Sequence, residues 1–157
     1  MVKLSPRLQH LLDLCEPGLP LWDLCCDHGL LGFAAIESGK FGDVVLNDAV
    51  AHVVEDLNRK LATSDDSGRT ILALAEEISE PLTGNVVIAG VGGEKIFKIL
   101  KTHAEQNRLH ARHLILCPEK HAAWLGEQTI PGFQLREQTS IPHNHRTRRI
   151  LHFVAAD

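Results

Sequence analysis

Two kinds of apolar segment are missing from this sequence. No apolar run approaches the roughly 18 residues that a membrane-spanning helix requires, so we exclude a membrane-spanning protein. The N-terminal stretch MVKLSPRLQHLL contains no apolar signal core followed by a small-residue cleavage site. We therefore expect a cytoplasmic protein without disulfides. With 157 residues the chain can bury one substantial core, and we expect a single domain over residues 1–157.

Cysteines are few, and none of them has the C-x-x-C spacing that suits zinc or redox chemistry. The four are Cys15, Cys25, Cys26 and Cys117. Cys25 and Cys26 are adjacent, and neighbouring residues of a strand point to opposite faces, so the pair cannot easily converge on one metal ion. We expect no metal site, and we interpret these cysteines as small buried apolar residues.

Basic residues are scarce in the first half of the chain. Residues 1–78 contain 6 basic and 13 acidic side chains, whereas residues 79–157 contain 10 and 7. Part of the C-terminal excess lies in HNHRTRR, residues 143–149, which includes Arg146, Arg148 and Arg149 and no acid. The segment is a candidate site for an anionic partner such as RNA, or a solvated loop that joins two strands.

Apolar stretches of strand length alternate with helical patterns along most of the chain. The alternation predicts an α/β fold with a mostly parallel sheet and helices on both faces. A further helix is expected within residues 1–17 and begins at Ser5-Pro6. The last two strands have no helix between them, which predicts an antiparallel hairpin. The expected strands are 19–26, 43–48, 70–76, 85–90, 113–118, 133–140 and 148–155, with a loop at 62–70 and a short helical turn after the third strand.

Acidic residues follow the first two predicted strands, where open parallel sheets bind their ligands. Asp48 lies 25 residues after Asp23, at the end of the second strand. A carboxylate in this position can accept hydrogen bonds from both hydroxyls of a ribose, which suggests an adenosine cofactor. Alternatively, Asp48 is the N-cap of a helix that begins near Ala49.

The turn after the first strand lacks the GxGxxG pattern with which dinucleotide binders approach a pyrophosphate. It reads CCDHGLLG, and the carboxylates of Asp23 and Asp27 would repel phosphates. Acids are better suited to a ligand that carries a sulfonium and an ammonium group, and S-adenosylmethionine carries both. A nicotinamide-dependent oxidoreductase is therefore disfavoured.

Four segments together resemble a known family: DLCCDHGLLG, LNDAV, VIAGVGGEKI and LILCPEKHAAWL, in this order and spacing. They are similar to bacterial tRNA adenine N1-methyltransferases that act on the D-arm. The resemblance covers residues 4 to about 130. It implies a Rossmann-like class I methyltransferase fold, whose seven-stranded sheet ends in an antiparallel hairpin, and S-adenosylmethionine as the cofactor.

The resemblance also implies roles for individual residues. Asp48 and Ala49 would hold the ribose of the cofactor, and Glu76 would lie near its adenine. The remaining cofactor-binding candidates follow the first and fourth strands: Asp23, Cys25, Asp27, His28, Gly29, Ala89, Gly90 and Val91. Gly92 and Gly93 would line the gap between the methyl group and the incoming base, where a glycine lets the backbone approach closely and adopt positive φ.

Two side chains are candidates for contact with the reacting base. His28 can exchange protons near neutral pH, but it can equally pack near the cofactor while Asp27 caps the following helix. Glu94 can contact an exocyclic amine, and its place at a helix start also suits the helix dipole. Methyl transfer to adenine N1 needs no strong base, because this nitrogen already has a lone pair.

Three features depart from the family. Cys25 stands where the family has glycine, Leu30 replaces an aromatic residue, and the chain contains no tyrosine to stack on a base. We also expect the helical C-terminal extension of the family to be missing. These departures leave open an alternative function, a methyltransferase-like module that binds RNA or a protein partner without turnover.

Overall fold

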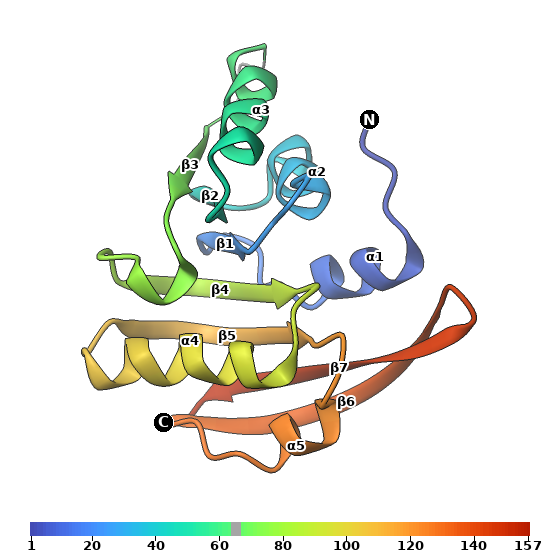
Figure 1. Cartoon of the computed structure of the whole chain (residues 1–157), viewed down its shortest axis with the longest axis vertical. Helices are drawn as coiled ribbons and strands as arrows, with labels where there is room; N and C mark the ends of the chain where they lie inside the picture. Colours follow the sequence, from blue (N-terminus) through green and yellow to red (C-terminus); the bar gives the residue numbers. More distant parts are fainter. Residues whose placement is uncertain (64–66) are drawn as a thin grey trace.

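The structure is a computed structural model that describes residues 1–63 and 67–157. Its centre is a seven-stranded sheet with the order β3-β2-β1-β4-β5-β7-β6 (Figure 1). The first five strands are parallel, and β7 is antiparallel to both β5 and β6. This arrangement confirms the predicted sheet and its terminal hairpin. The strands are β1 (Leu21–Leu24), β2 (Val44–Asp48), β3 (Gly68–Leu72), β4 (Leu82–Ala89), β5 (Leu109–Cys117), β6 (Phe133–His143) and β7 (Arg146–Ala155).

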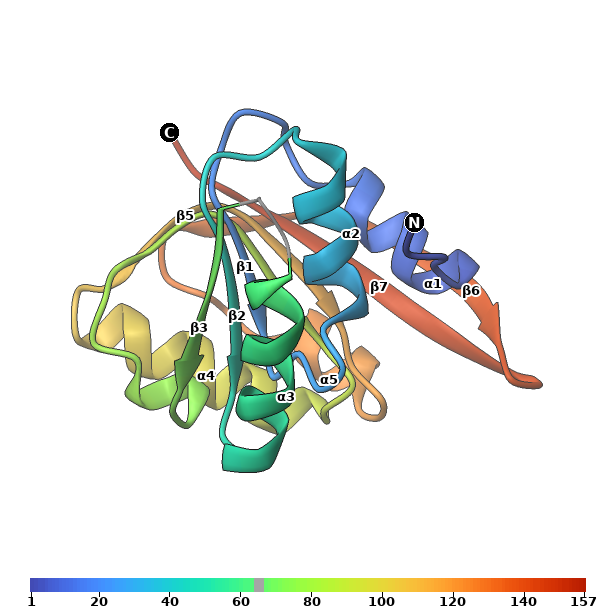
Figure 2. The same ribbon diagram turned by 90° about the horizontal axis from the view of Figure 1, so that it is seen from above.

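Helices cover both faces of the sheet (Figure 2). One face packs against the first three helices, and its core includes Leu11, Leu31 and Leu57. The other packs against α4, α5 and a 3₁₀ turn, and includes Ile96 and Leu125. The helices are α1 (Pro6–Asp13), α2 (Leu30–Ser38), α3 (Ala51–Ala62), η1 (Ala75–Glu77), α4 (Gly93–Glu105) and α5 (Ala122–Gly126). In the part of the chain that the structure describes, no helix has the length and apolarity of a membrane span.

Helix α1 starts where the sequence predicts, but it ends at Asp13, before the end of the segment 1–17 in which the helix was expected. The hydroxyl of Ser5 accepts a hydrogen bond from the Leu8 amide at 3.3 Å, so Ser5 is the N-cap. The helix ends at Asp13 because the chain then turns to meet β4. There the buried Asn85 side chain accepts from the Glu16 amide at 2.8 Å and donates to the Glu16 carbonyl at 3.0 Å.

Strand β3 differs from its prediction at both ends. It begins at Gly68 and stops at Leu72 instead of running from 70 to 76, so the predicted loop at 62–70 is wrong from Gly68 onward, while 64–66 lie outside the described residues. The strand ends because the Asn47 side chain donates to the carbonyls of Ile71 and Ala73, at 3.1 and 3.0 Å. The expected short helical turn follows as η1.

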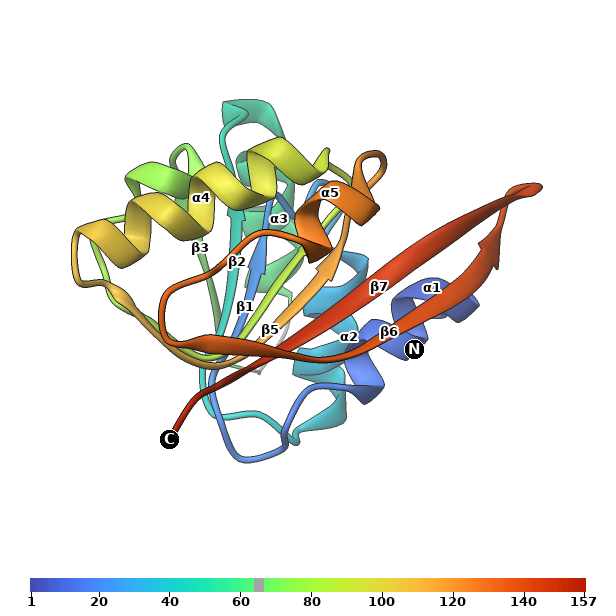
Figure 3. The same ribbon diagram turned by 90° about the horizontal axis from the view of Figure 1, so that it is seen from below.

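The C-terminal hairpin is longer than predicted and projects past the rest of the sheet, beside α1 (Figure 3). Its turn consists of Asn144 and His145, with φ of 48° and 63°, the left-handed conformations that suit a tight hairpin. The interpretation of residues 143–149 as a loop is therefore wrong. These residues form the tip of a two-stranded ribbon.

Candidate functional site

The sheet reverses its direction of growth between β1 and β4, and the candidate site lies where these strands end. The chain leaves β1 through a turn in which Cys25, Asp27 and Gly29 have φ of 55°, 51° and 72°. Two non-glycine residues in the left-handed region cost free energy, of order 1–2 kcal/mol each, and persist only when neighbours fix them.

Residues at the end of β2 hold the turn after β1 in this conformation. The Cys25 amide donates to the Asn47 side-chain oxygen at 3.3 Å, and the Cys26 amide donates to the Asn47 carbonyl at 2.8 Å. The Asp27 amide donates to Asp48 Oδ2 at 3.0 Å. Asn47 is fully buried and also holds the end of β3, so it connects three strands at the site. Sequence analysis assigned it no role, although a polar residue at the end of an otherwise apolar strand was a usable signal.

The alternative role of Asp48 as the N-cap of the following helix is wrong, because α3 begins at Ala51 and its N-cap is Val50. Asp48 Oδ1 accepts from the Val50 amide at 3.0 Å, just before the helix. Each carboxylate oxygen has two lone pairs, so one bond to each leaves acceptor capacity for ribose hydroxyls. Asp48 is half-buried and Ala49 is exposed beside it.

Asp23 caps the helix that was expected to be capped by Asp27. The Asp23 Oδ2 atom accepts from the Gly32 amide, in the first turn of α2, at 3.0 Å. The Asp27 side chain is 71% exposed and lies 3.8 Å from His28 Nε2, so the predicted Asp27 cap is wrong. Burial raises the pKa of Asp23 to about 7, the Gly32 hydrogen bond opposes this shift, and the charge of Asp48 adds to it.

The adjacent cysteines have the packing role that the sequence predicts. Cys25 packs against the core on the α4 side of the sheet, and Cys26 packs against the core on the α2 side. All four cysteines are free. Burial raises the pKa of the Cys25 thiol to about 11, and it also raises that of Cys26, so both remain protonated near neutral pH.

The loop after β4 is held by backbone contacts instead of side chains. The Glu119 amide donates to the Val91 carbonyl, and the Gly93 amide donates to the Lys120 carbonyl, both at 2.9 Å. A Cβ on Gly93 would lie 2.7 Å from the His121 carbonyl oxygen, so this glycine is needed for packing. Positive φ at Gly92 and Gly93 is a wrong expectation, because Gly92 has φ of −73° and Gly93 is helical.

Positive φ occurs instead at Gly90, where φ is 77° and an added Cβ would meet nothing within 4 Å. Open space above Gly90 is compatible with a ligand that passes close to the backbone. Glu94, at the start of α4, is 61% exposed and pairs with His121 Nδ1. The Glu94 carboxylate thus has a protein partner in addition to the favourable helix terminus.

Glu76 lies on η1, one strand away from Asp48. Its side chain is only 11% exposed, and Lys98 Nζ lies 3.9 Å from Oε2. The Oε1 atom is buried and has no protein donor among the described residues. Because buried carboxylate oxygens are normally hydrogen-bonded, this atom fits a ligand N–H group such as the exocyclic amine of adenine.

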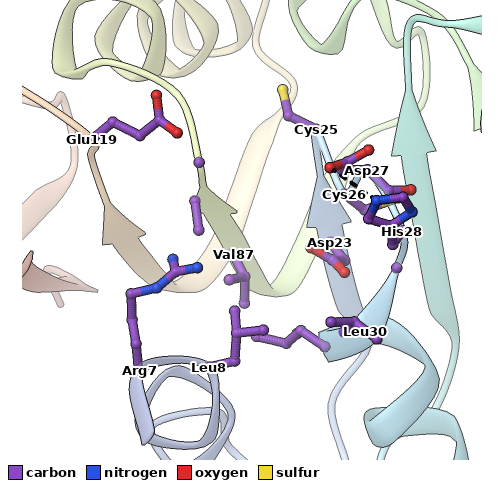
Figure 4. A pocket seen from close by; sticks show the side chains of 14 residues that line it. Arg7, Leu8, Asp23, Cys25, Cys26, Asp27, His28, Leu30, Val87 and Glu119 are labelled. Atoms are coloured by element: carbon purple, nitrogen blue, oxygen red, sulfur yellow. Dashed lines mark hydrogen bonds and ion pairs between the residues drawn. The ribbon is translucent and has the colours of Figure 1, made fainter. Parts of the chain in front are cut away.

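A cavity of about 280 Å³ lies over the ends of β1 and β4 (Figure 4). It brings together seven of the predicted residues: Asp23, Cys25, Asp27, His28, Gly29, Ala89 and Gly90. Asp48, Ala49, Glu76 and residues 91–94 do not line it. Arg7 and Leu8 also line the cavity and were not predicted, because α1 is brought there by tertiary packing alone. Glu119, in the loop after β5, lines it as well and was not predicted. Within residues 1–63 and 67–157, no group of three or more His, Cys, Asp or Glu could hold a metal ion.

The fold and the site together define a Rossmann-like α/β protein whose candidate ligand site lies beyond the ends of β1 and β4. The model of a family described as methyltransferase domain matches residues 4–151, so the chain belongs to this family. S-adenosylmethionine is the cofactor that such a domain implies, and a module without turnover is not favoured. No curated protein matches the sequence.

Solved structures share the fold at low sequence identity. The B. subtilis m1A22 tRNA methyltransferase TrmK has a TM-score of 0.85 and 22% identity, with 100% of this chain and 68% of that chain covered. M. capricolum TrmK in complex with S-adenosylhomocysteine has a TM-score of 0.81 and 17% identity, with 97% of this chain and 69% of that chain covered. Magnesium protoporphyrin IX methyltransferase from Synechocystis PCC 6803 with bound S-adenosylmethionine has a TM-score of 0.72 and 20% identity, with 96% of this chain and 76% of that chain covered.

Proposed function

We propose that residues 1–157 form one methyltransferase domain that transfers a methyl group from S-adenosylmethionine to N1 of an adenine in tRNA. The proposal is carried by the turn after β1. Hydrogen bonds to the side chains of Asn47 and Asp48 hold this turn in a strained backbone conformation, and the turn lies beside a cavity that Asp23 lines. The structure of B. subtilis TrmK, whose name specifies an m1A22 tRNA methyltransferase, supports the choice of acceptor.

The cofactor would lie across the ends of β1, β2 and β4. Asp48 and Ala49 would hold its ribose, and the buried Oε1 of Glu76 would accept from its adenine. The walls around its methionine part would be Asp23, Cys25, Asp27, His28, Gly29, Ala89, Gly90 and Val91. When bound, S-adenosylmethionine supplies an electrophilic methyl group on a sulfonium, which the acids of this site favour.

The protein's contribution to the reaction is positional. The lone pair of adenine N1 forms the new N–C bond as the C–S bond breaks, and the positive charge moves to the base. Gly92 and Gly93 would fix the loop beside the incoming base, and Glu94 would reach its exocyclic amine. Holding the reacting atoms about 3–3.5 Å apart and excluding water can supply most of the rate enhancement. A base in a tRNA stem must first leave its stack.

His28 is given no proton-transfer step in this mechanism. Its side chain is 76% exposed, and Nε2 lies 3.8 Å from Asp27 Oδ2, too far for a hydrogen bond. A general base must be held within hydrogen-bonding distance of the proton that it removes, and adenine N1 has no proton to remove. We propose that His28 flanks the methionine part of the cofactor.

The ribbon tip is the proposed RNA contact. Arg148 is paired with Ile141, which packs towards the α1 side, whereas the neighbouring Arg149 points to the other side and donates to Gln138. Together with Arg146 these cations give both sides of the tip a positive charge that suits an RNA backbone. Such an enzyme would work in the cytoplasm, in agreement with four free cysteines.

The test measures cofactor binding first and transfer second. Saturation with S-adenosylmethionine to about 100 times its dissociation constant should add about 2.7 kcal/mol of stability, or about 5–10 °C in Tm. NAD should give no shift. The purified protein should then transfer labelled methyl groups to tRNA, and primer extension should stop at the modified adenine.

A matched variant keeps this test specific. Asp48→Asn preserves the side-chain size and the Oδ1 acceptor but removes the charge, so we expect weaker cofactor binding in a folded protein. Transfer to tRNA that already carries N1-methyladenine at the target should be lost. Equal incorporation into premethylated and unmodified tRNA would contradict the proposed acceptor.

A further inference from the structure

Arg7 is a partly desolvated cation whose charge has no anionic partner in the described residues. It lies in the first turn of α1, and its Nε atom is buried without a hydrogen-bond acceptor. Its guanidinium donates from Nη1 to Cys117 Sγ, at 3.8 Å. Burial raises the pKa of this thiol, so Cys117 is a neutral and weak acceptor. A guanidinium in such surroundings is costly unless an anion binds to it.

The cavity places this cation opposite two acids. Arg7 reaches in from α1 on one side, whereas Asp23 and Asp27 lie on the other side, at the end of β1 (Figure 4). Glu119 lines the same side as Arg7, but no ion pair within 4.0 Å joins these two residues. The cavity therefore sets a cation without an ion-paired partner opposite two carboxylates, which is the charge pattern that an α-amino acid group requires.

A zwitterionic group fits this pattern in one orientation. Its ammonium would face Asp23, which is buried and keeps acceptor capacity beyond its bond to Gly32. Its carboxylate would face Arg7, whose planar guanidinium can donate two parallel hydrogen bonds to a carboxylate. The cavity, of about 280 Å³, has room for an amino-acid side arm between Arg7 and the acids of the β1 turn.

We propose that Arg7 binds the α-carboxylate of the methionine part of S-adenosylmethionine, so that α1 completes the cofactor site. This inference rests on the proposed function. It adds a residue outside the β1, β2 and β4 loops and predicts which chemical group of the cofactor that residue recognises.

Decarboxylated S-adenosylmethionine tests the inference, because it lacks only the carboxylate. Loss of a hydrogen-bonded charge pair costs about 1.5–3 kcal/mol, which corresponds to roughly 10–150-fold in affinity. In the wild type we expect S-adenosylmethionine to bind at least about tenfold more tightly than its decarboxylated form. In Arg7→Met the affinity for S-adenosylmethionine should fall by a similar factor, while the decarboxylated form should bind at least as well as before.

Two variants control for general effects of the substitution. Arg149→Met also removes a cation, but from the side of the ribbon where Arg149 contacts Gln138, and it should leave the preference for the carboxylate unchanged. Arg7→Lys should retain part of that preference, because an ammonium supplies the charge without the planar pair of donors. Circular dichroism and Tm of the free proteins check that Arg7→Met is folded.

The possible failures are distinguishable by calorimetry. Equal binding of both compounds to the wild type would overturn the role of Arg7 while leaving the methyltransferase intact. An Arg7→Met protein that keeps its carboxylate preference and loses tRNA affinity would also overturn it, and would make Arg7 a phosphate contact beside Arg148. If neither compound nor S-adenosylhomocysteine binds the wild type, both the inference and the proposed function fail.

Discussion

The turn after β1 and the loop after β4 line the same crevice, but different forces hold them. The first has residues in unfavourable backbone conformations and is fixed by the side chains of Asn47 and Asp48. The second is fixed by main-chain hydrogen bonds to the loop after β5, with Gly93 pressed against His121. The turn after β1 therefore depends on the polar side chains of a neighbouring strand, whereas the loop after β4 depends on the absence of a side chain at Gly93.

Asn47→Ala should have the largest effect, because it removes the fixation of the β1 turn. The variant leaves the Cys25 amide and the carbonyls of Ile71 and Ala73 without their partner, at a cost of about 1–3 kcal/mol for each group that stays buried. We expect a loss of about 3 kcal/mol or more in the free energy of unfolding, measured by urea denaturation.

Asn58→Ala is the matched control, since Asn58 is an exposed asparagine on α3 whose side chain accepts a hydrogen bond from the Thr70 hydroxyl. It should cost less than about 0.5 kcal/mol. A similar loss of stability in both variants would contradict the special role of Asn47.

Gly93→Ala tests the loop after β4. The added methyl group would lie 2.7 Å from a backbone oxygen, which a rotamer change cannot relieve. We expect a loss of about 1–3 kcal/mol in stability, the usual range for overpacking, together with weaker tRNA methylation. Unchanged stability would show that the loop after β5 moves freely, and the proposed close packing of Gly93 against the His121 carbonyl would be wrong.

The pH dependence of cofactor binding sharpens the role of Asp23. With a pKa of about 7, Asp23 is largely protonated at pH 6 and largely ionised at pH 8. A cationic ligand binds the ionised form better, so the affinity for S-adenosylmethionine should rise with pH by up to about tenfold over this interval. Calorimetry on wild type and Asp23→Asn checks this, and an equal slope in both would exclude Asp23 as its source.

Asp23 also gives stability a pH dependence of known sign. Its ordinary pKa is 3.8, so between pH 3.8 and about 7 the folded protein binds more protons at this site than the unfolded chain does. The contribution of Asp23 to stability therefore decreases as the pH rises through this interval. Asp23→Asn should remove that decrease from the urea-denaturation profile.

Gly90→Ala should have the smallest effect and completes the comparison with Gly93. Space for a methyl group exists at Gly90, but its φ of 77° costs an alanine about 1–2 kcal/mol, partly offset by lower entropy of the unfolded chain. We expect a net loss of about 0.5–1 kcal/mol in urea denaturation. If Gly90→Ala lost more stability than Gly93→Ala, the conclusion that close packing at Gly93 matters more than positive φ at Gly90 would be wrong.

Sequence reasoning succeeded where periodicity and topology decide the structure. Strand and helix alternation predicted the parallel sheet, and the rule for open sheets then placed Asp23 at its ligand-binding edge. The family resemblance added Gly29 and Gly90, which line the same cavity. It failed where tertiary contacts decide. The length of β3 depends on Asn47, and the cap of α2 comes from Asp23 because the turn rotates Asp27 outward.

Arg7 shows the same limit most clearly. Nothing in the residues around it marks it as a ligand contact, and its place at the cavity results from the packing of Leu11 against the sheet. The hairpin turn had a weak local signal in Asn144, a residue that tolerates positive φ, but no glycine accompanies it.

The projecting ribbon has a consequence for the solution behaviour of the protein. β7 pairs with β6 along its whole length and with β5 only from Leu151 to Val154, so the preceding residues of β7 pair with β6 alone. The outer part of β7 thus presents backbone groups on which a strand of another molecule could form, and such edges promote aggregation. Arg146, Arg148 and Arg149 concentrate like charges along that stretch, so mutual repulsion between ribbons would protect the protein from edge-to-edge association.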